Sequence, residues 1–222
     1  MKSINTFILE KLKINKDTDI YNYHPKDRDE LSSLIKKLIE ERGNEADLND
    51  IDVSKVTDMN SIFYKSKFNG DISEWNVSNV KDMAHMFSGS EFNKDISNWN
   101  VSNVKDMQSM FFESKFNGNI SKWNVSKVAD MTFMFYNTKF NQDISKWNVS
   151  NVTDMFQMFS FSKFNKDISS WDESNVENMG SMFLGSVFNQ DISSWDVSNV
   201  ETMRDMFNDC PLEKNPPKWY KK

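Results

Sequence analysis

Hydrophobic and aromatic residues recur every 24 residues from Asp47 to Lys214, which divides this part of the chain into seven units. Two Phe columns, two Met columns and one Trp column keep this step. The Trp column holds Trp75, Trp99, Trp123, Trp147, Trp171, Trp195 and Trp219. A fixed period of about 20 to 50 residues is typical of repeat proteins, in which one unit cannot bury its apolar face alone and neighbouring units stack. The pattern therefore predicts a solenoid of seven 24-residue coils.

The second unit, residues 71–94, shows what each coil should contain. Its apolar residues Val80, Met83, Met86 and Phe87 have helical spacing and predict a short helix, with a Ser–Asn pair as the N-cap. The segment 75–77 alternates as a strand does. These features predict an α/β fold with one short helix and one short extended segment per unit. Eight columns should be buried in every coil, represented by Phe68, Ile72, Trp75, Val77, Val80, Met83, Met86 and Phe87.

The segments on either side of the repeats predict caps. In residues 1–46, Asp27 and Glu30 have capping-box spacing, an apolar helical face follows, and Gly43 ends the helix. A second capping helix is expected before it, from Ile4, Phe7, Ile8 and Leu12. In residues 215–222, Pro216-Pro217 prevents another coil. We expect 1–46, 47–214 and 215–222 to form one structural domain.

The unit F-N-x-D-I-S-x-W-N-V-S-N-V-x-D-M-x-x-M-F resembles the repeat of the BspA-like leucine-rich-repeat surface proteins of bacteria. The resemblance covers residues 47–214. It implies a leucine-rich-repeat-like α/β solenoid, a cell-surface location and a role in adhesion or protein–protein contact. It carries no catalytic residues over to this chain.

The composition limits the kinds of chemistry and partner that the chain can support. The chain has 222 residues, a formal net charge of −6, one Cys and two His, so it offers little for metal or acid–base chemistry. Its acidic repeats disfavour nucleic acid, and no apolar run reaches the roughly 18 residues of a membrane span. We expect no enzyme activity, no cofactor and no membrane insertion. The absence of a readable signal peptide or lipobox predicts a cytoplasmic protein, whereas the family resemblance predicts the cell surface.

Two polar columns are candidates for turn chemistry. From Asp71 to Asp191, the first column contains five Asp and one Asn, which suggests either calcium between coils or Asx side chains that cap turns. Calcium sites in repeats usually need Gly-rich turns, so we favour turn capping. The column of Asn69 predicts an asparagine ladder. Glu173 replaces the Val of the other units and is expected at an exposed coil edge, and Cys210 is expected as a small residue in the last turn.

The outward positions that do not repeat indicate where a partner binds. Large aromatic residues occupy such positions in the third to fifth units: Phe112, Phe133, Tyr136, Phe156 and Phe161. Exposed aromatic patches mark partner sites, but the same side chains also suit gaps between neighbouring coils, and both interpretations stay open. We therefore expect a monomeric, non-enzymatic protein–protein interaction module. The alternative is an adhesive or structural component of a cell or virion surface.

Overall fold

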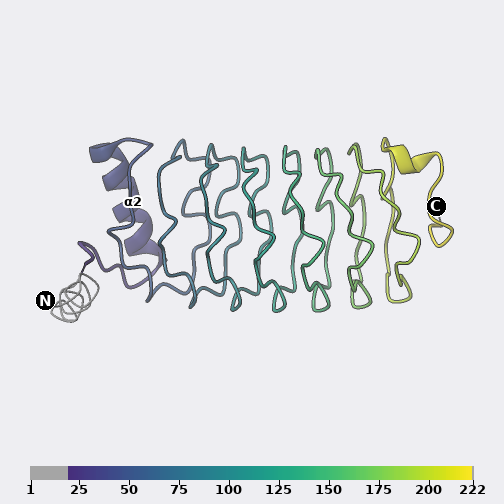
Figure 1. Cartoon of the computed structure of the whole chain (residues 1–222), viewed down its shortest axis with the longest axis horizontal. Coiled ribbons are helices and arrows are strands. Elements are labelled where there is room, and N and C mark those ends of the chain that lie inside the picture. Colours follow the sequence, from purple (N-terminus) through teal and green to yellow (C-terminus); the bar gives the residue numbers. More distant parts are fainter. Residues whose placement is uncertain (1–19, 222) are drawn as a thin grey trace, which may run out of the picture.

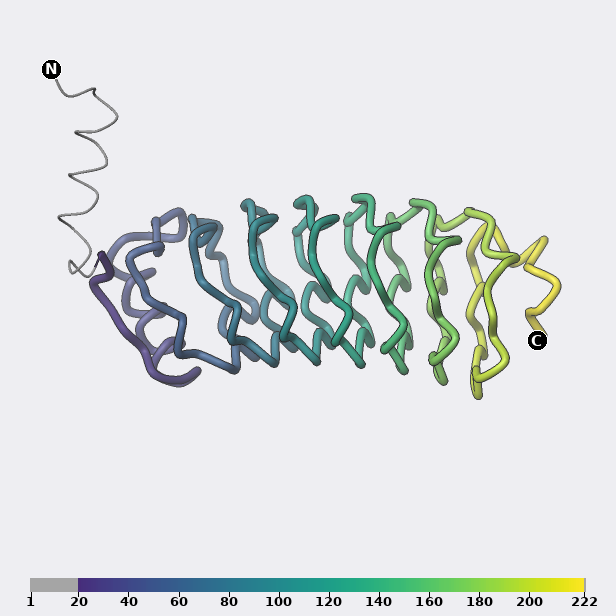
Figure 2. The backbone as a smooth tube through the Cα atoms, turned by 60° about the horizontal axis from the view of Figure 1, so that its bottom comes forward, coloured from purple at the N-terminus to yellow at the C-terminus, as the bar shows by residue number. Residues whose placement is uncertain are grey.

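The 24-residue units form coils that stack along one axis, as the computed structural model of residues 20–221 shows (Figure 1). The stack runs without a sharp bend from the N-terminal helix to the C-terminal segment (Figure 2). Isolated parallel bridges join residues 24 apart: Asp47 pairs with Asp71, and a continuous series runs from Asp58 and Asp82 to Asn178 and Thr202. The sequence period is therefore the length of one coil.

In the first coil, the backbone N–H groups of residues 59–65 alternate between acceptors in the next coil and acceptors in their own coil. The Met59 and Phe63 N–H groups donate to Asp82 and Met86 of the next coil, at 2.9 and 3.0 Å. The intervening Ile62 N–H donates within its own coil to the Met59 carbonyl. The segment is thus a run of tight turns that is hydrogen-bonded to the same segment of the next coil, and this pattern repeats along the stack.

The prediction of a short helix in every unit is wrong. In the second unit, His85 and Gly89 have φ of 57° and 66°, and every unit has positive φ at these two positions. A right-handed helix excludes such angles. Within residues 20–221 the only α-helix is α2, Arg28–Arg42, and the one 3₁₀-helix is η1, Pro211–Glu213. Alternate N–H groups donate to carbonyls of the next coil, and not to the carbonyl four residues earlier as in a helix. The helical spacing of the apolar residues therefore identifies the buried face of this segment, but the segment is not a helix.

The predicted strand is also absent. Residues 75–77 connect two tight turns, in which the Trp75 N–H donates to the Ile72 carbonyl and the Val80 N–H donates to the Val77 carbonyl. Parallel pairing between coils recurs only in the Asp82 column among the described residues, and there as single bridges; one further bridge joins Asp47 to Asp71 and another joins Tyr23 to Ile51. The described residues therefore form a repeat domain with little regular secondary structure.

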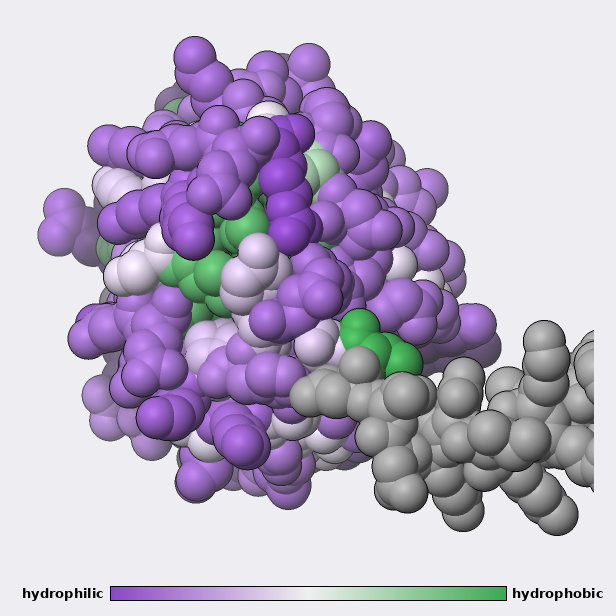
Figure 3. Space-filling model, turned by 90° about the vertical axis from the view of Figure 1, so that its left-hand side faces the viewer, coloured by the Kyte–Doolittle hydropathy of each residue, from purple (hydrophilic) through white to green (hydrophobic). Residues whose placement is uncertain are grey.

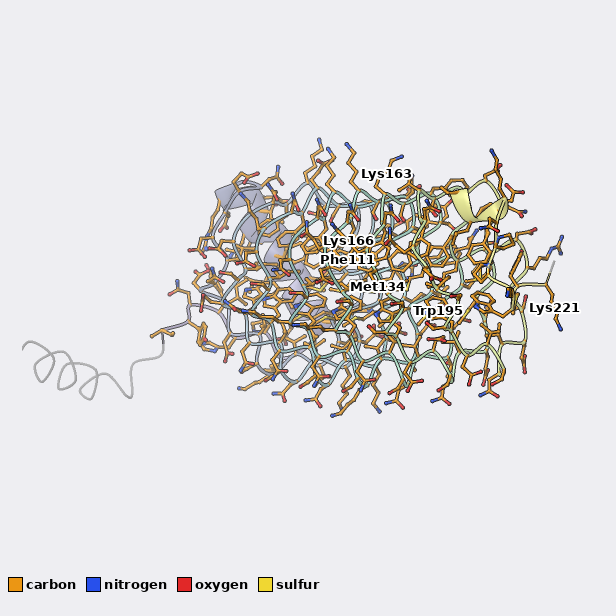
Figure 4. All side chains as sticks on the ribbon, turned by 45° about the vertical axis from the view of Figure 1, so that its right-hand side comes forward. Phe111, Met134, Lys163, Lys166, Trp195 and Lys221 are labelled. Carbon is orange, nitrogen blue, oxygen red and sulfur yellow. The ribbon has the colours of Figure 1, made fainter. Side chains whose placement is uncertain are left out.

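The core consists of side-chain ladders, and all eight predicted columns are buried in the second unit. Phe87 stacks on Phe111 with ring centroids 5.7 Å apart, and Trp75 stacks on Trp99 at 6.3 Å. The Trp99 Nε1 donates to the Ile72 carbonyl of the preceding coil at 3.1 Å, which pairs the one polar atom of the indole. Figure 4 shows Phe111 and Met134 inside the stack.

Polar ladders close the turns, and here both predictions are confirmed. The Asp71 carboxylate accepts the Ser73 N–H at 2.9 Å, and Asn119 does the same for Ser121 at 3.0 Å. In the asparagine ladder, each Asn Oδ1 accepts the backbone N–H of the Asn in the next coil, as between Asn117 and Asn141. These side chains satisfy turn backbone that would otherwise lack partners.

Helix α2 covers the N-terminal end of the stack. The Asp27 side chain accepts the Asp29 and Glu30 N–H groups, and Gly43 follows the helix with φ of 88°, so the predicted helix and its caps are confirmed. Its buried face is Leu31, Ile35 and Leu38. Figure 3 views this end and shows apolar side chains between polar ones. The second helix expected before residue 20 lies outside the described residues.

Candidate protein-binding site

The five predicted aromatic residues lie on the outer face of the turn segments. Four columns point outward there, represented in the fourth unit by Thr132, Phe133, Tyr136 and Asn137. Phe161 is 43% exposed. Phe112, Phe133, Tyr136 and Phe156 are partly buried. We call these five residues the aromatic face.

The five rings form one connected cluster. Phe112 stacks on Tyr136 with centroids 4.7 Å apart and an interplanar angle of 5°. Phe133 makes edge contacts with Phe112, Tyr136 and Phe156, the last at 5.3 Å. Phe161 meets Tyr136 edge-on at 5.6 Å. Side chains from three consecutive coils thus make a continuous apolar surface.

Two glycines of the sixth unit leave room for two rings of the aromatic face, and the sequence did not lead us to expect this. A Cβ on Gly180 would come within 3.0 Å of the Phe156 ring, and one on Gly185 within 2.5 Å of the Phe161 ring. The signal was present in the sequence, because each glycine follows an aromatic residue by 24 positions in the same outward column. These rings therefore lean over the next coil, where no side chain occupies the space.

Two members of the aromatic face have a backbone that suits them poorly. Phe133 and Phe161 both have φ of 57°. The left-handed region costs a residue with a Cβ about 1–2 kcal/mol, and it is unusual for a bulky side chain. Other units place residues such as Ser181 or Gly185 in these columns. The fold requires the angle in every coil, but it does not require the aromatic rings.

Charged columns border the aromatic face. On one edge the exposed column begins with Lys81 and Lys105 and ends with Glu177 and Glu201. The opposite edge carries exposed lysines in the third to fifth units, among them Lys163 (Figure 4). Between the first edge and the rings lies a column of partly buried aspartates, and burial raises the pKa of the Asp106 carboxyl. The rings thus lie between a mixed-charge edge and a basic edge.

Glu173 is not at an exposed edge, and this prediction is wrong. Only 3% of its surface is exposed, because its column points into the coil whichever residue occupies it. Oε1 accepts the Asp196 N–H, while Oε2 has no hydrogen-bond partner among the described residues. Burial raises the pKa of this carboxyl.

The structure also places the remaining residues that could take part in nucleophilic, acid–base or metal chemistry. Cys210 is buried in the last turn, and burial raises the pKa of its thiol. Partly buried His85 lies on the outer face in the second unit. In residues 20–221, no group of three or more His, Cys, Asp and Glu side chains is arranged to hold a metal ion.

Comparison with known proteins gives one match. A family model described as "Mycoplasma protein of unknown function, DUF285" matches residues 30–139 and, in a second overlapping match, residues 113–219. No curated protein and no solved structure matches the chain significantly. No helix among the described residues is long and apolar enough to cross a membrane.

Proposed function

The chain belongs to the DUF285 family of Mycoplasma proteins of unknown function, and we propose that it is a non-enzymatic protein-binding module that uses the aromatic face. The observation that carries the proposal is the placement of five clustered rings on outward positions where other units, apart from Tyr64 and Leu184, have small, polar or charged residues. Partly exposed Phe and Tyr side chains contribute strongly to protein interfaces.

The backbone supports the same conclusion. Phe133 and Phe161 keep bulky rings at φ values that favour Gly or Asn. Partial burial of a ring between coils offsets some of this cost, but other units occupy the same columns with smaller residues such as Ser181 and Gly185. Retaining the rings despite this cost is consistent with a role outside folding.

We also propose that the stack is a leucine-rich-repeat-like solenoid of the BspA-like kind, on the grounds of its unit motif and its stacked coils. That relationship favours a second candidate function, adhesion at the cell surface. Protease treatment of intact cells discriminates between locations. Digestion of the protein supports the surface, and protection while a known surface protein is digested contradicts it.

The aromatic face is tested by comparing the wild type with the variant F112S/F133S/Y136S/F156S/F161S. The control is Y64S, which removes a 49% exposed aromatic residue of the first unit, outside the cluster. Each protein is first melted, and then used as bait in lysate of the source cell. We expect a partner that the wild type and the control recover and the five-fold variant does not.

Recovery of the same partner by all three proteins would contradict the proposal. If the five-fold variant does not fold, F161G replaces it, because Gly occupies this column at residues 89 and 185. Loss of the partner by F161G without loss of melting temperature would support the aromatic face on its own.

A further inference from the structure

We propose that the partner of the aromatic face is a second copy of this chain, bound antiparallel across a two-fold axis between the fourth and fifth units. This inference rests on the proposed function, since it names the partner of the same face. It is carried by a self-complementary order of charges and ring positions along the stack.

Symmetry determines which residues meet. A two-fold axis that lies in the interface and crosses the stack at right angles reverses the order of units and keeps each column opposite itself. With the units numbered from 47–70 to 191–214, the second then faces the seventh, the third faces the sixth and the fourth faces the fifth. Any column can be read against its own reversal.

The charged edge is complementary to its own reversal. Its exposed column runs Lys81, Lys105, Ala129, Thr153, Glu177, Glu201. Reversed, it places Lys81 opposite the partner's Glu201 and Lys105 opposite the partner's Glu177, and the two-fold axis doubles both pairs. The uncharged residues meet at the axis. Opposite charges in register select partner and orientation at an interface.

The rings are complementary in size under the same operation. No aromatic residue of one copy faces an aromatic residue of the other. Tyr136 faces the partner's Ser160. The other four rings also face non-aromatic residues: Phe112 faces Leu184, Phe133 faces Gln157, Phe156 faces Thr132 and Phe161 faces Asn137, each on the partner. The rings of one copy therefore meet aliphatic or polar side chains of the other copy, and not its rings.

The register is specific. A shift of one unit places Tyr136 on the partner's Tyr136 and Glu201 opposite Thr57, which removes a charge pair and the alternation of large and small side chains. Like charges meet at two other places, where Lys139 faces the partner's Lys163 and Asp130 faces the partner's Asp154, so these columns oppose association. Specific attraction at the charged edge therefore comes from the Lys81 column.

Sedimentation equilibrium of the full chain tests the inference. The wild type should associate to twice 26.1 kDa, and K81E/K105E or E177K/E201K should each weaken association about tenfold or more, because like charges then meet. Mixing these two variants should restore a dimer that contains one of each. The control K122E/K146E changes two exposed lysines on a different column and should dimerise as the wild type does.

Two results would overturn the inference. One is a wild type that stays monomeric up to about 100 µM, well above the Kd of a specific dimer. The other is association that charge reversal leaves unchanged. If the wild type is monomeric but binds a different protein, and the five-fold serine variant does not bind that protein, only the inference that the partner is a second copy fails. If the five-fold serine variant dimerises as well as the wild type and loses no partner, the proposed function fails too.

Discussion

Replacing Glu173 by Val should stabilise the protein. Five equivalent positions hold a buried Val, namely Val53, Val77, Val101, Val125 and Val149, so the coil accepts this side chain without rearrangement. Glu173 instead buries a carboxylate whose Oε2 has no hydrogen-bond partner among the described residues.

The size of the effect follows from the two oxygens. Leaving a buried polar group unpaired costs about 1–3 kcal/mol, and a charged group lies at the upper end of this range, at about 2–3 kcal/mol. The bond from the Asp196 N–H to Oε1 contributes about 1 kcal/mol and is lost in the variant. The expected net gain at neutral pH is therefore about 1–2 kcal/mol in the free energy of unfolding, which in a chain of this length raises Tm by roughly 2–8 °C.

The gain should depend on pH. Burial raises the pKa of Glu173 in the folded state above its unfolded value, so between these two values the folded protein binds more protons than the unfolded one. The contribution of this group to stability therefore falls as pH rises through that window and recovers on acidification. The advantage of E173V should be largest at neutral pH and smaller near the ordinary Glu pKa of about 4.3.

Urea unfolding followed by Trp fluorescence at several pH values measures both effects. E74V serves as the control, because Glu74 is exposed, and its substitution should change stability little. Equal stability of E173V and the wild type at neutral pH, or an advantage that does not shrink on acidification, would refute the reasoning that an unpaired buried carboxylate destabilises this coil.

Three further substitutions test the turns and the cap. N117A removes the oxygen that accepts the Asn141 N–H at an exposed turn, and we expect a loss of about 0.5–1.5 kcal/mol, measured by urea unfolding. D27A removes the N-cap of α2 and should lower stability by about 0.5–2 kcal/mol in the same assay, while an unchanged midpoint would show that the cap is dispensable. The Ser145 backbone N–H lowers the pKa of Asp143, so this carboxylate stabilises the fold above its unfolded pKa and loses that contribution as pH falls through the lowered value. D143N keeps an acceptor, as Asn119 does naturally, and should flatten this part of the acid unfolding curve.

Much of the candidate site was predictable from the sequence. The 24-residue period identifies outward columns, and departures from it single out the five aromatic residues, which the structure joins into one cluster. The space that Gly180 and Gly185 leave for two of the rings was not predicted, because the sequence does not show in which direction a ring points. Glu173 was misplaced because a charged residue was taken as evidence of exposure, although its column points inward in neighbouring coils.

The sequence alone determined the length of one coil, the buried columns, the N-terminal helix with its caps, and the two polar ladders at the turns. These features depend on periodicity and on local side-chain chemistry, which a single chain displays directly. The conformation of the segment around residues 83–87 depends instead on contacts between coils. In an isolated unit its spacing fits a helix, but in the stack alternate N–H groups bond to carbonyls of the next coil. Those bonds require positive φ at two positions per unit, and the contacts between coils therefore replace the local helix with tight turns.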